Sequence, residues 1–207
     1  GGNHLNDLLA KSKVVVLVYD ENQIMNKSQI WTDDAFFKLE HEANLKGNLI
    51  TLHNQMRIHA TKETVEWIRN LIDVGVVNEV PRDNDYDIRV FDSPEELQSA
   101  IMEKNDNQSL GISRLTATYD WEYSSQSKPK DSDYWCVRIG DWSCPWNRQL
   151  AKEKESKHLS WIEQSQTIHE IGSTFTVQGF DLNYVGVIIG PSVKYRDGKI
   201  IFDISES

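Results

Sequence analysis

The 207-residue chain has 39% hydrophobic and 26% charged residues, a balance typical of a folded globular protein rather than a disordered one. No apolar run approaches the roughly 20 residues that a membrane helix needs, and residues 1–4 lack a signal-peptide pattern, so we expect a soluble cytoplasmic protein. The net charge of −10 leaves few Lys and Arg residues for independent binding to DNA or RNA. Nucleic-acid binding would therefore need a local patch or a second domain.

The first quarter of the chain predicts a strand, a helix and a second strand. Residues 13–19 form a continuous β-branched run, typical of a strand that is covered on both faces. A helix is expected from Thr32, and Gly47 is its natural stop. Residues 49–52 are expected to form the second, shorter strand.

The middle of the chain continues the alternation of helices and strands. Thr61 is expected to cap a helix, residues 87–91 alternate as a half-buried strand, and Ser93 followed by Pro and Glu predicts another helix start. Residues 110–118 predict a further strand. The stretch 119–158, rich in Trp, Ser, Asp and Lys, is interpreted as an irregular Trp-rich insertion.

The last third predicts strands. One is expected at 135–139 inside the insertion, two more at 173–177 and 184–189, and a hairpin over 194–202. Strands that alternate with helices favour an α/β sandwich with a mainly parallel sheet. Because the chain ends soon after a strand, without a closing helix, we interpret it as a fragment of a larger fold.

The two cysteines, Cys136 and Cys144, lie eight positions apart. A structural zinc site needs about four ligands at defined spacing, which the chain does not offer, so we expect no metal site. A disulfide between the two is an open alternative, but buried free thiols are the preferred interpretation.

Polar clusters follow three of the predicted strands, at 20–23, 55–57 and 174–181. Each cluster alone is typical of an ordinary turn, because strands must turn where they end. In open α/β sheets, however, binding sites gather at the carboxyl ends of strands. Three such clusters in this order therefore indicate a functional site.

These clusters resemble motifs III, IV and V of superfamily-one helicases. They read Asp-Glu-Asn-Gln at 20–23, His-Asn-Gln-Met-Arg at 53–57, and Gly-Ser-Thr-Phe-Thr-Val-Gln-Gly-Phe-Asp at 172–181, followed by Tyr-Val-Gly-Val-Ile-Ile-Gly at 184–190. More narrowly, the chain resembles a bacterial family of uncharacterised DNA/RNA helicases whose motor is akin to that of the Schlafen proteins. The last stretch is the most specific, and the resemblance covers most of the chain from 14 to about 195.

The resemblance implies a role for each matching residue. Gln23 corresponds to the motif III glutamine that senses the γ-phosphate, and Asp20 precedes it in the same turn. Arg57 corresponds to the motif IV arginine that reaches the nucleotide phosphates, a task that suits a permanently charged, planar guanidinium. Motif V, which links nucleic-acid contacts to the ATP site, is implied to use Gln178 and Gly179 on the nucleotide side. Its implied nucleic-acid coupling residues are Thr174, Thr176 and Asp181.

The family likeness also implies a fold and partners. It implies a RecA-like, P-loop NTPase-type three-layer sandwich, with residues 1–47 at the end of a preceding motor domain or the start of this one. Residues 48–207 would form the second RecA-like domain, interrupted by the Trp-rich insertion. The intact parent protein would use ATP and Mg²⁺, the preceding RecA-like domain, and single-stranded DNA or RNA.

Two departures from the family pattern bear on activity. Phe175 stands where the family usually has His. The chain contains no G-x-x-x-x-G-K-[ST] phosphate-binding loop, and the arginine segment of motif VI is also absent. Phosphoryl transfer depends on such groups for positioning and electrostatics, so we expect no cofactor and no catalysis in this segment alone.

Alternatives remain open. Asp20 and Glu21 also fit the Mg²⁺-binding Asp and catalytic Glu of a Walker B strand. Trp121 or Trp142 fits a base-stacking role, although packing of the insertion is the preferred interpretation. A hydrolase that pairs Asp20 with a histidine would need a proximity that the sequence does not give. The acidic charge and the tryptophans suit a non-enzymatic protein-interaction module as well.

Overall fold

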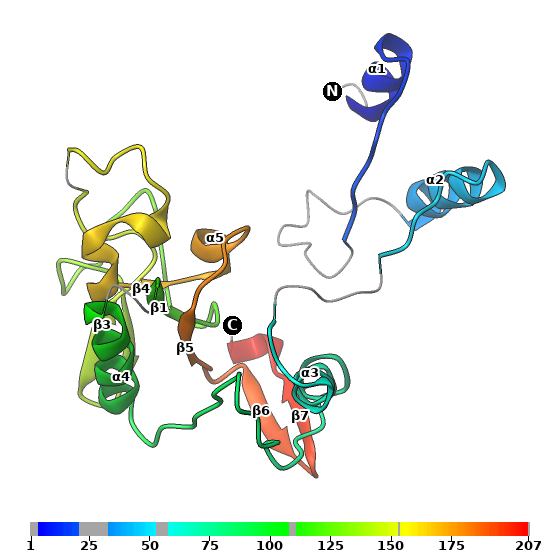
Figure 1. Cartoon of the computed structure of the whole chain (residues 1–207). Coiled ribbons are helices and arrows are strands. Elements are labelled where there is room, and N and C mark those ends of the chain that lie inside the picture. Colours follow the sequence, from blue (N-terminus) through cyan, green and yellow to red (C-terminus); the bar gives the residue numbers. More distant parts are fainter. Residues whose placement is uncertain (1–3, 21–32, 53–57, 108–110, 153, 207) are drawn as a thin grey trace. The chain divides into compact units, whose positions relative to one another are not determined.

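The structure is a computed structural model of a mixed α/β chain (Figure 1). The chain divides into two compact units, Gly1–His53 and Asn54–Ser207, which are described separately. The residues described are 4–20, 33–52, 58–107, 111–152 and 154–206.

The described residues of the first unit form two helices. Helix α1 spans His4–Lys11 and helix α2 spans Asp33–Leu45. Gly47 follows α2 with a φ of +67°, a left-handed conformation that glycine adopts without steric cost. The predicted helix and its stop are therefore confirmed.

The strand predicted at 13–19 is wrong for the described residues. Residues 14–20 form no regular secondary structure and pair with no strand in the described part of the chain. Val14, Val16 and Val18 are 78%, 84% and 84% exposed. The same holds for the strand predicted at 49–52, which has no ladder partner among the described residues. A β-branched run needs a neighbouring strand to form a ladder, and sequence pattern alone does not supply one.

The second unit begins with a capped helix. Helix α3 spans Lys62–Arg69 and continues into a π-helical turn, η3, at Asn70–Val74. The predicted cap is confirmed, because the Thr64 amide donates to Thr61 Oγ1 at 3.4 Å. Asp83 secures this end: its carboxylate accepts from the Thr61 amide at 2.8 Å and from Thr64 Oγ1 at 2.7 Å. The hydrogen bond from Thr64, above all, holds the pKa of Asp83 well below its usual range.

Helix α4, which spans Pro94–Asp106, also starts where the sequence predicts. The Glu96 amide donates to Ser93 Oγ at 3.2 Å, which satisfies one of the free amides of the first turn. The strand predicted at 87–91 is wrong, because these residues form no regular secondary structure and join no ladder among the described residues. Val90 in this segment is 86% exposed.

A three-stranded parallel sheet lies at the centre of the second unit. Its order is β4 (Ile171–Gly172), β1 (Ser113–Ala117) and β5 (Tyr184–Ile188). Leu115 on β1 is in register with Ile171 on one side and Gly186 on the other. The strands predicted at 110–118 and 184–189 are thus confirmed as β1 and β5.

Helix α4 packs against this sheet, as Figure 1 shows. The contact is close because Gly186 has no side chain: a Cβ there would lie 2.6 Å from Leu115 and 2.9 Å from Ile101. Leu115 and Ile101 are 1% and 6% exposed and belong to the main hydrophobic core. The glycine of the Tyr-Val-Gly-Val run is therefore a packing residue.

The described part of this unit also contains two antiparallel hairpins. Strands β2 (Cys136–Ile139) and β3 (Trp142–Pro145) pair within the Trp-rich insertion, which confirms the strand predicted at 135–139. Strands β6 (Val193–Arg196) and β7 (Lys199–Phe202) confirm the predicted hairpin. Its turn residues Asp197 and Gly198 have φ values of 50° and 82°, as a two-residue hairpin turn requires. Single-turn helices are η5 (Trp161–Glu163), η6 (Ser165–His169) and η7 (Ile204–Glu206).

The strand predicted at 173–177 is wrong: after β4 the chain forms a short helix, α5, at Thr174–Val177. The hydroxyl of Thr176 explains the turn. It accepts from the Ser173 amide and donates to the Ser173 carbonyl, both at 2.8 Å. Threonine favours strands by propensity, but a local bond between side chain and backbone competes with the ladder here.

Both cysteines are free thiols, in agreement with the preferred interpretation. Cys144 on β3 is 3% exposed, whereas Cys136 is half-buried. Burial, above all, raises the pKa of Cys144 to about 12, so this thiol stays protonated and unreactive at neutral pH. Within the described residues, no group of three or more His, Cys, Asp and Glu side chains could hold a metal ion.

The tryptophans of the insertion pack the core. Trp146 is fully buried, and Trp121, Trp135 and Trp142 pack against the same hydrophobic cluster. Their indole nitrogens are also engaged: Trp121 Nε1 donates to the Arg138 carbonyl at 3.1 Å, and Trp142 Nε1 donates to Gln98 Oε1 at 3.1 Å. These tryptophans therefore pack against the core, as the preferred interpretation expects.

Candidate functional site at the carboxyl edge of the parallel sheet

The carboxyl ends of β1, β4 and β5 lie at the same edge of the sheet because the three strands are parallel. Residues 118–120 follow β1, residues 173–181 follow β4 and residues 189–192 follow β5. We call these three segments the carboxyl edge. Ligands of open α/β sheets bind outside this end of the strands, so it is the first place to look for a site.

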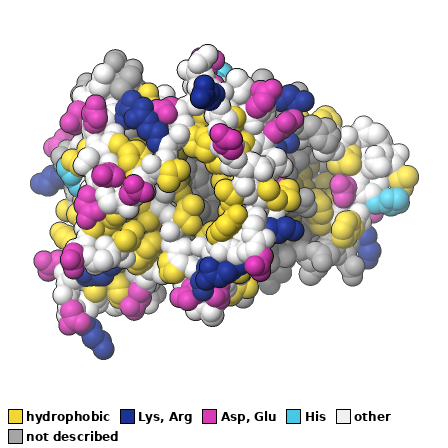
Figure 2. Space-filling model, turned by 90° about the horizontal axis from the view of Figure 1, so that it is seen from below, with side chains coloured by type: hydrophobic (Ala, Val, Ile, Leu, Met, Phe, Trp, Pro, Cys, Tyr) yellow, Lys and Arg dark blue, Asp and Glu magenta, His cyan; other side chains and the backbone are white. Residues whose placement is uncertain are grey.

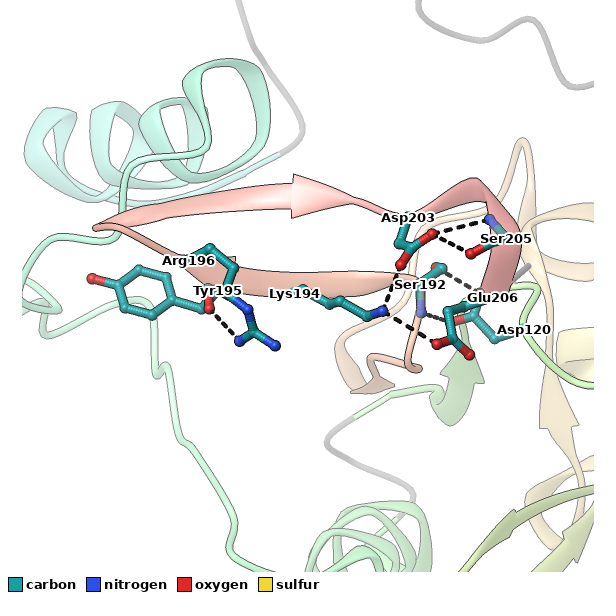
Figure 3. Close-up of polar contacts among 8 residues, drawn as sticks. All are labelled: Asp120, Ser192, Lys194, Tyr195, Arg196, Asp203, Ser205 and Glu206. Carbon is teal, nitrogen blue, oxygen red and sulfur yellow. Dashed lines mark hydrogen bonds and ion pairs between the residues drawn. The ribbon is translucent and has the colours of Figure 1, made fainter.

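Asp120 ties the end of β1 to the loop after β5. Its carboxylate accepts from the Ser192 amide at 2.9 Å and from Ser192 Oγ at 2.8 Å, as Figure 3 shows. The Gly190 amide donates to Thr118 Oγ1 at 2.7 Å. A Cβ at Gly190 would lie 2.2 Å from the Asp120 carboxylate, so only glycine allows this approach. These groups hold the edge together.

The charges at the base of the β6–β7 hairpin pair with one another (Figure 3). Lys194 Nζ lies 2.6 Å from the Asp203 carboxylate and 3.2 Å from that of Glu206. The hydrogen bond between Lys194 and Asp203 raises the pKa of Lys194. The same bond, above all, lowers the pKa of Asp203 to about 2. This partly exposed cluster closes the hairpin onto the last turn, η7.

A buried carboxylate lies just before the edge. Glu170 is 1% exposed and accepts three hydrogen bonds of 2.7 Å, from the backbone amides of Arg148 and Leu150 and from Trp161 Nε1. Asn147 and Arg148 have φ values of 68° and 69°, a left-handed conformation that is uncommon outside glycine. Glu170 therefore fixes a strained turn of the Trp-rich insertion against the sheet.

Asn147 links that turn to the start of α5. Its amide donates to the Ile171 carbonyl at 2.8 Å, and its side-chain oxygen accepts from Ser173 Oγ at 2.9 Å. Its side-chain nitrogen donates to the Tyr119 hydroxyl at 3.4 Å. Burial raises the pKa of Tyr119, so this hydroxyl remains protonated at neutral pH. One buried side chain thus connects the segments after β1 and β4.

Arg114 is a buried cation on β1 that serves packing. Its guanidinium donates to Thr167 Oγ1 at 2.8 Å, to Asn105 Oδ1 at 2.9 Å and to two backbone carbonyls. Burial lowers its pKa to about 10, which still leaves it charged at neutral pH. Neutral oxygens therefore solvate the buried charge of Arg114. The same hydrogen bonds connect β1 to α4, through Asn105, and to η6, through Thr167.

The structure brings the predicted motif V residues together in and after α5. Thr174, Gln178 and Asp181 are exposed, whereas Thr176 is 2% exposed and its hydroxyl holds the first turn of α5. Gly179 has a φ of +86°, and a Cβ there would meet nothing within 4 Å. Glycine is thus favoured at 179 for its backbone conformation.

The remaining predicted residues lie elsewhere. Asp20 is an exposed residue of the first unit, and Gln23 and Arg57 lie outside the described residues. Sequence reasoning missed Glu170 and Asn147. A weak signal was present for the second, because asparagine adopts the left-handed conformation more readily than most residues.

The fold and this edge define a mixed α/β domain with a polar segment after each strand of a parallel sheet. A family model described as "Schlafen group 3, DNA/RNA helicase domain" matches residues 1–207, and the chain belongs to this family.

A protein of Saccharomyces cerevisiae, described as uncharacterized protein YPL245W, is 31% identical over 219 residues. The match covers 94% of this chain and 45% of the yeast protein, so the chain spans about half the length of this relative. Because the relative is from yeast, the bacterial origin implied by the resemblance stays a prediction. No solved structure matches the chain. No helix in the described ranges is long and apolar enough to cross a membrane.

Proposed function

We propose that this chain is the C-terminal motor segment of an ATP-dependent DNA or RNA helicase or translocase of the superfamily-one type, with a RecA-like core. The observation that carries the proposal is the position of residues 174–181. They follow β4 at the carboxyl edge of a parallel sheet, and Thr174, Gln178 and Asp181 are exposed there. Membership of a DNA/RNA helicase family supports the same function.

In this proposal the segment supplies accessory groups and does not hydrolyse ATP alone. The family resemblance gives nucleotide-binding or sensing roles to Gln178, Gly179, Asp20, Gln23 and Arg57, and ATP would bind with Mg²⁺ in the intact protein. The guanidinium of Arg57 contacts phosphate oxygens through its planar fork of donors.

The nucleic-acid side of the proposal involves a single strand that runs past α5. Thr174, Thr176 and Asp181 couple this strand to the nucleotide, with Thr176 acting from its buried position through the fold of α5. The preceding RecA-like domain of the same polypeptide provides the other wall of the nucleotide site. The segment therefore contributes sensing and coupling, while the phosphate-binding loop belongs to that other domain.

The test is ATP hydrolysis by the whole protein that contains this segment, with and without single-stranded DNA and RNA. Arg57→Ala is expected to lower stimulated hydrolysis by about 100-fold or more, because a charge that stabilises the transferred phosphoryl group is lost. Arg82→Ala, at an exposed arginine, is the matched control and should keep the parent rate. A whole protein that is inert with every strand, or an Arg57→Ala variant with unchanged activity, would contradict the proposal.

A second candidate is a non-enzymatic interaction module. Val185, Val187 and Ile189, in and just after β5, are 47%, 53% and 60% exposed, which offers an apolar stripe to a protein partner. Apolar side chains also reach the face drawn in Figure 2, interspersed with acidic and basic ones. This function predicts that the whole protein binds its partner equally well with and without ATP.

A further inference from the structure

Three aromatic rings lead from the core to the surface at the carboxyl edge. The Trp146 and Tyr119 ring centroids are 5.0 Å apart, and those of Tyr119 and Phe175 are 5.6 Å apart with the ring planes at 85°. Trp146 is fully buried, whereas Tyr119 is 41% and Phe175 is 49% exposed. The outer two rings come from different segments, one after β1 and one within α5.

The inner end of this series is fixed. Trp146 Nε1 donates to the Glu122 carbonyl at 3.3 Å, and the Trp146 amide donates to the Trp135 carbonyl at 3.0 Å. The Tyr119 hydroxyl accepts from Asn147, which is itself 5% exposed and bonded to Ser173. The two exposed rings therefore rest on a rigid base and lose little conformational freedom when a ligand contacts them.

The position of the rings suggests what they contact. Phe175 lies between Thr174 and Thr176, inside the segment that we propose couples nucleic acid to the nucleotide site. A phenylalanine has no hydrogen-bond donor or acceptor, so it can contact a ligand only through its apolar ring. Stacking of a nucleobase on such a ring is a sequence-tolerant contact that proteins use for single strands.

The region that contains Tyr119 does not share the acidic charge of the rest of the chain. Region 119–158 has seven acidic and seven basic residues, so the net charge of −10 lies entirely outside it. Arg148, which directly follows Asn147, is exposed and lines a polar depression of about 310 Å³ together with Lys128. Proteins that bind single strands combine such cations, which contact the phosphates, with exposed rings, which contact the bases.

We propose that Tyr119 and Phe175 form a base-stacking platform for single-stranded DNA or RNA, with Arg148 and Lys128 on the side of the phosphates. This inference rests on the proposed motor function and adds the residues that hold the bases. It also differs from the sequence-based hypothesis, which considered Trp121 and Trp142 for stacking. Those two rings are partly buried and pack against the core.

The experiment measures binding of the whole protein to fluorescent strands of about 16 nucleotides. The probes are DNA, RNA, and a DNA strand of the same length without bases. Phe175→Ala is expected to weaken binding of strands with bases by about 5- to 100-fold and to leave the abasic strand almost unchanged. Phe175→Trp should restore binding, because a larger ring retains the stacking face.

The controls separate stacking from folding. Phe202→Ala, at a 71% exposed phenylalanine on β7, should bind every probe like the parent protein. Tyr119→Phe keeps the ring and should also bind normally, whereas Tyr119→Ala should resemble Phe175→Ala. Arg148→Ala should weaken binding of the abasic strand and of strands with bases alike, because phosphates are common to all of them.

The possible outcomes distinguish the two proposals. If the parent protein binds the abasic strand and hydrolyses ATP in response to nucleic acid, but Phe175→Ala has no base-dependent loss, the platform is refuted and the motor function stands. Equal losses on the abasic strand and on strands with bases would also refute the platform. If the parent protein binds no strand at all, both proposals fail. Equal losses on DNA and RNA would mean that the platform reads bases without regard to the sugar.

Discussion

Two polar clusters of the second unit differ in how they are solvated. The cluster around Glu170 and Asn147 is buried, with exposures of 1% and 5%, and nearly every bond in it reaches the backbone or a buried side chain. The cluster around Lys194 and Asp203 is partly exposed, with side-chain exposures of 27% and 34%. Water can replace the lost partner in the second cluster but not in the first. The same kinds of groups should therefore contribute very unequally to stability.

The largest effect is expected from Glu170→Ala. The change leaves two partly buried amides and the buried Trp161 indole without an acceptor, which should lower the free energy of unfolding by about 3–5 kcal/mol. Urea unfolding followed by tryptophan fluorescence measures it. Glu155→Ala, at an exposed glutamate, is the control and should change little. A loss below about 1 kcal/mol would mean that the Glu170 bonds do not secure the turn.

An intermediate effect is expected at Asn147, where backbone strain and side-chain bonds act together. Asn147→Gly removes the bonds to Ser173 and Tyr119 but tolerates a φ of 68°, so it should cost about 1–2 kcal/mol. Asn147→Ala adds the strain of a left-handed Cβ and should cost roughly 1 kcal/mol more. The difference between the two variants in urea unfolding isolates the backbone term. Equal losses would indicate that the left-handed conformation relaxes.

The smallest effect is expected from the Lys194 cluster, and it should depend on pH. The pKa of Asp203 is about 2 in the folded chain, below its value of about 3.9 in an unfolded one. The unfolded state therefore binds protons first, so this stabilisation is complete above pH of about 4 and is lost as pH falls towards 2. Asp203→Asn should therefore make the free energy of unfolding depend less steeply on pH in that range.

The Lys194 end of the same cluster titrates at the other extreme. The pKa of Lys194 is raised in the folded chain, so its contribution to stability is complete below the unfolded pKa and is lost as pH rises through the folded pKa.

The Asp203 prediction is tested by the urea midpoints of the parent chain and of Asp203→Asn, measured from pH of about 2 to 5. Identical slopes in the two proteins would contradict the assignment. Any residual slope belongs in part to Asp83, whose pKa is also depressed.

The predictions from the sequence that depend on local contacts are the ones that are confirmed. The caps at Thr61 and Ser93 and the stop at Gly47 are confirmed because a cap uses groups only three or four residues apart. The run at 13–19 is continuously β-branched and apolar, whereas β1 reads Ser-Arg-Leu-Thr-Ala, yet only β1 forms a ladder among the described residues. A ladder needs a distant partner, and no local pattern specifies one. The strand predicted at 173–177 is wrong because of a local contact that strand propensity does not include. The Thr176 hydroxyl accepts from the Ser173 amide and stabilises α5 instead.

For the candidate site, the sequence by itself determined the motif order, the family resemblance and the segment 174–181. It also determined that Phe175 departs from the family pattern. Only the tertiary structure decided that Tyr119 lies beside Phe175, that Asn147 joins their two segments, and that Trp121 and Trp142 pack the core. The physical reason is that contacts between residues tens of positions apart arise from the pairing of parallel strands and the burial of Trp146, and a sequence pattern records neither.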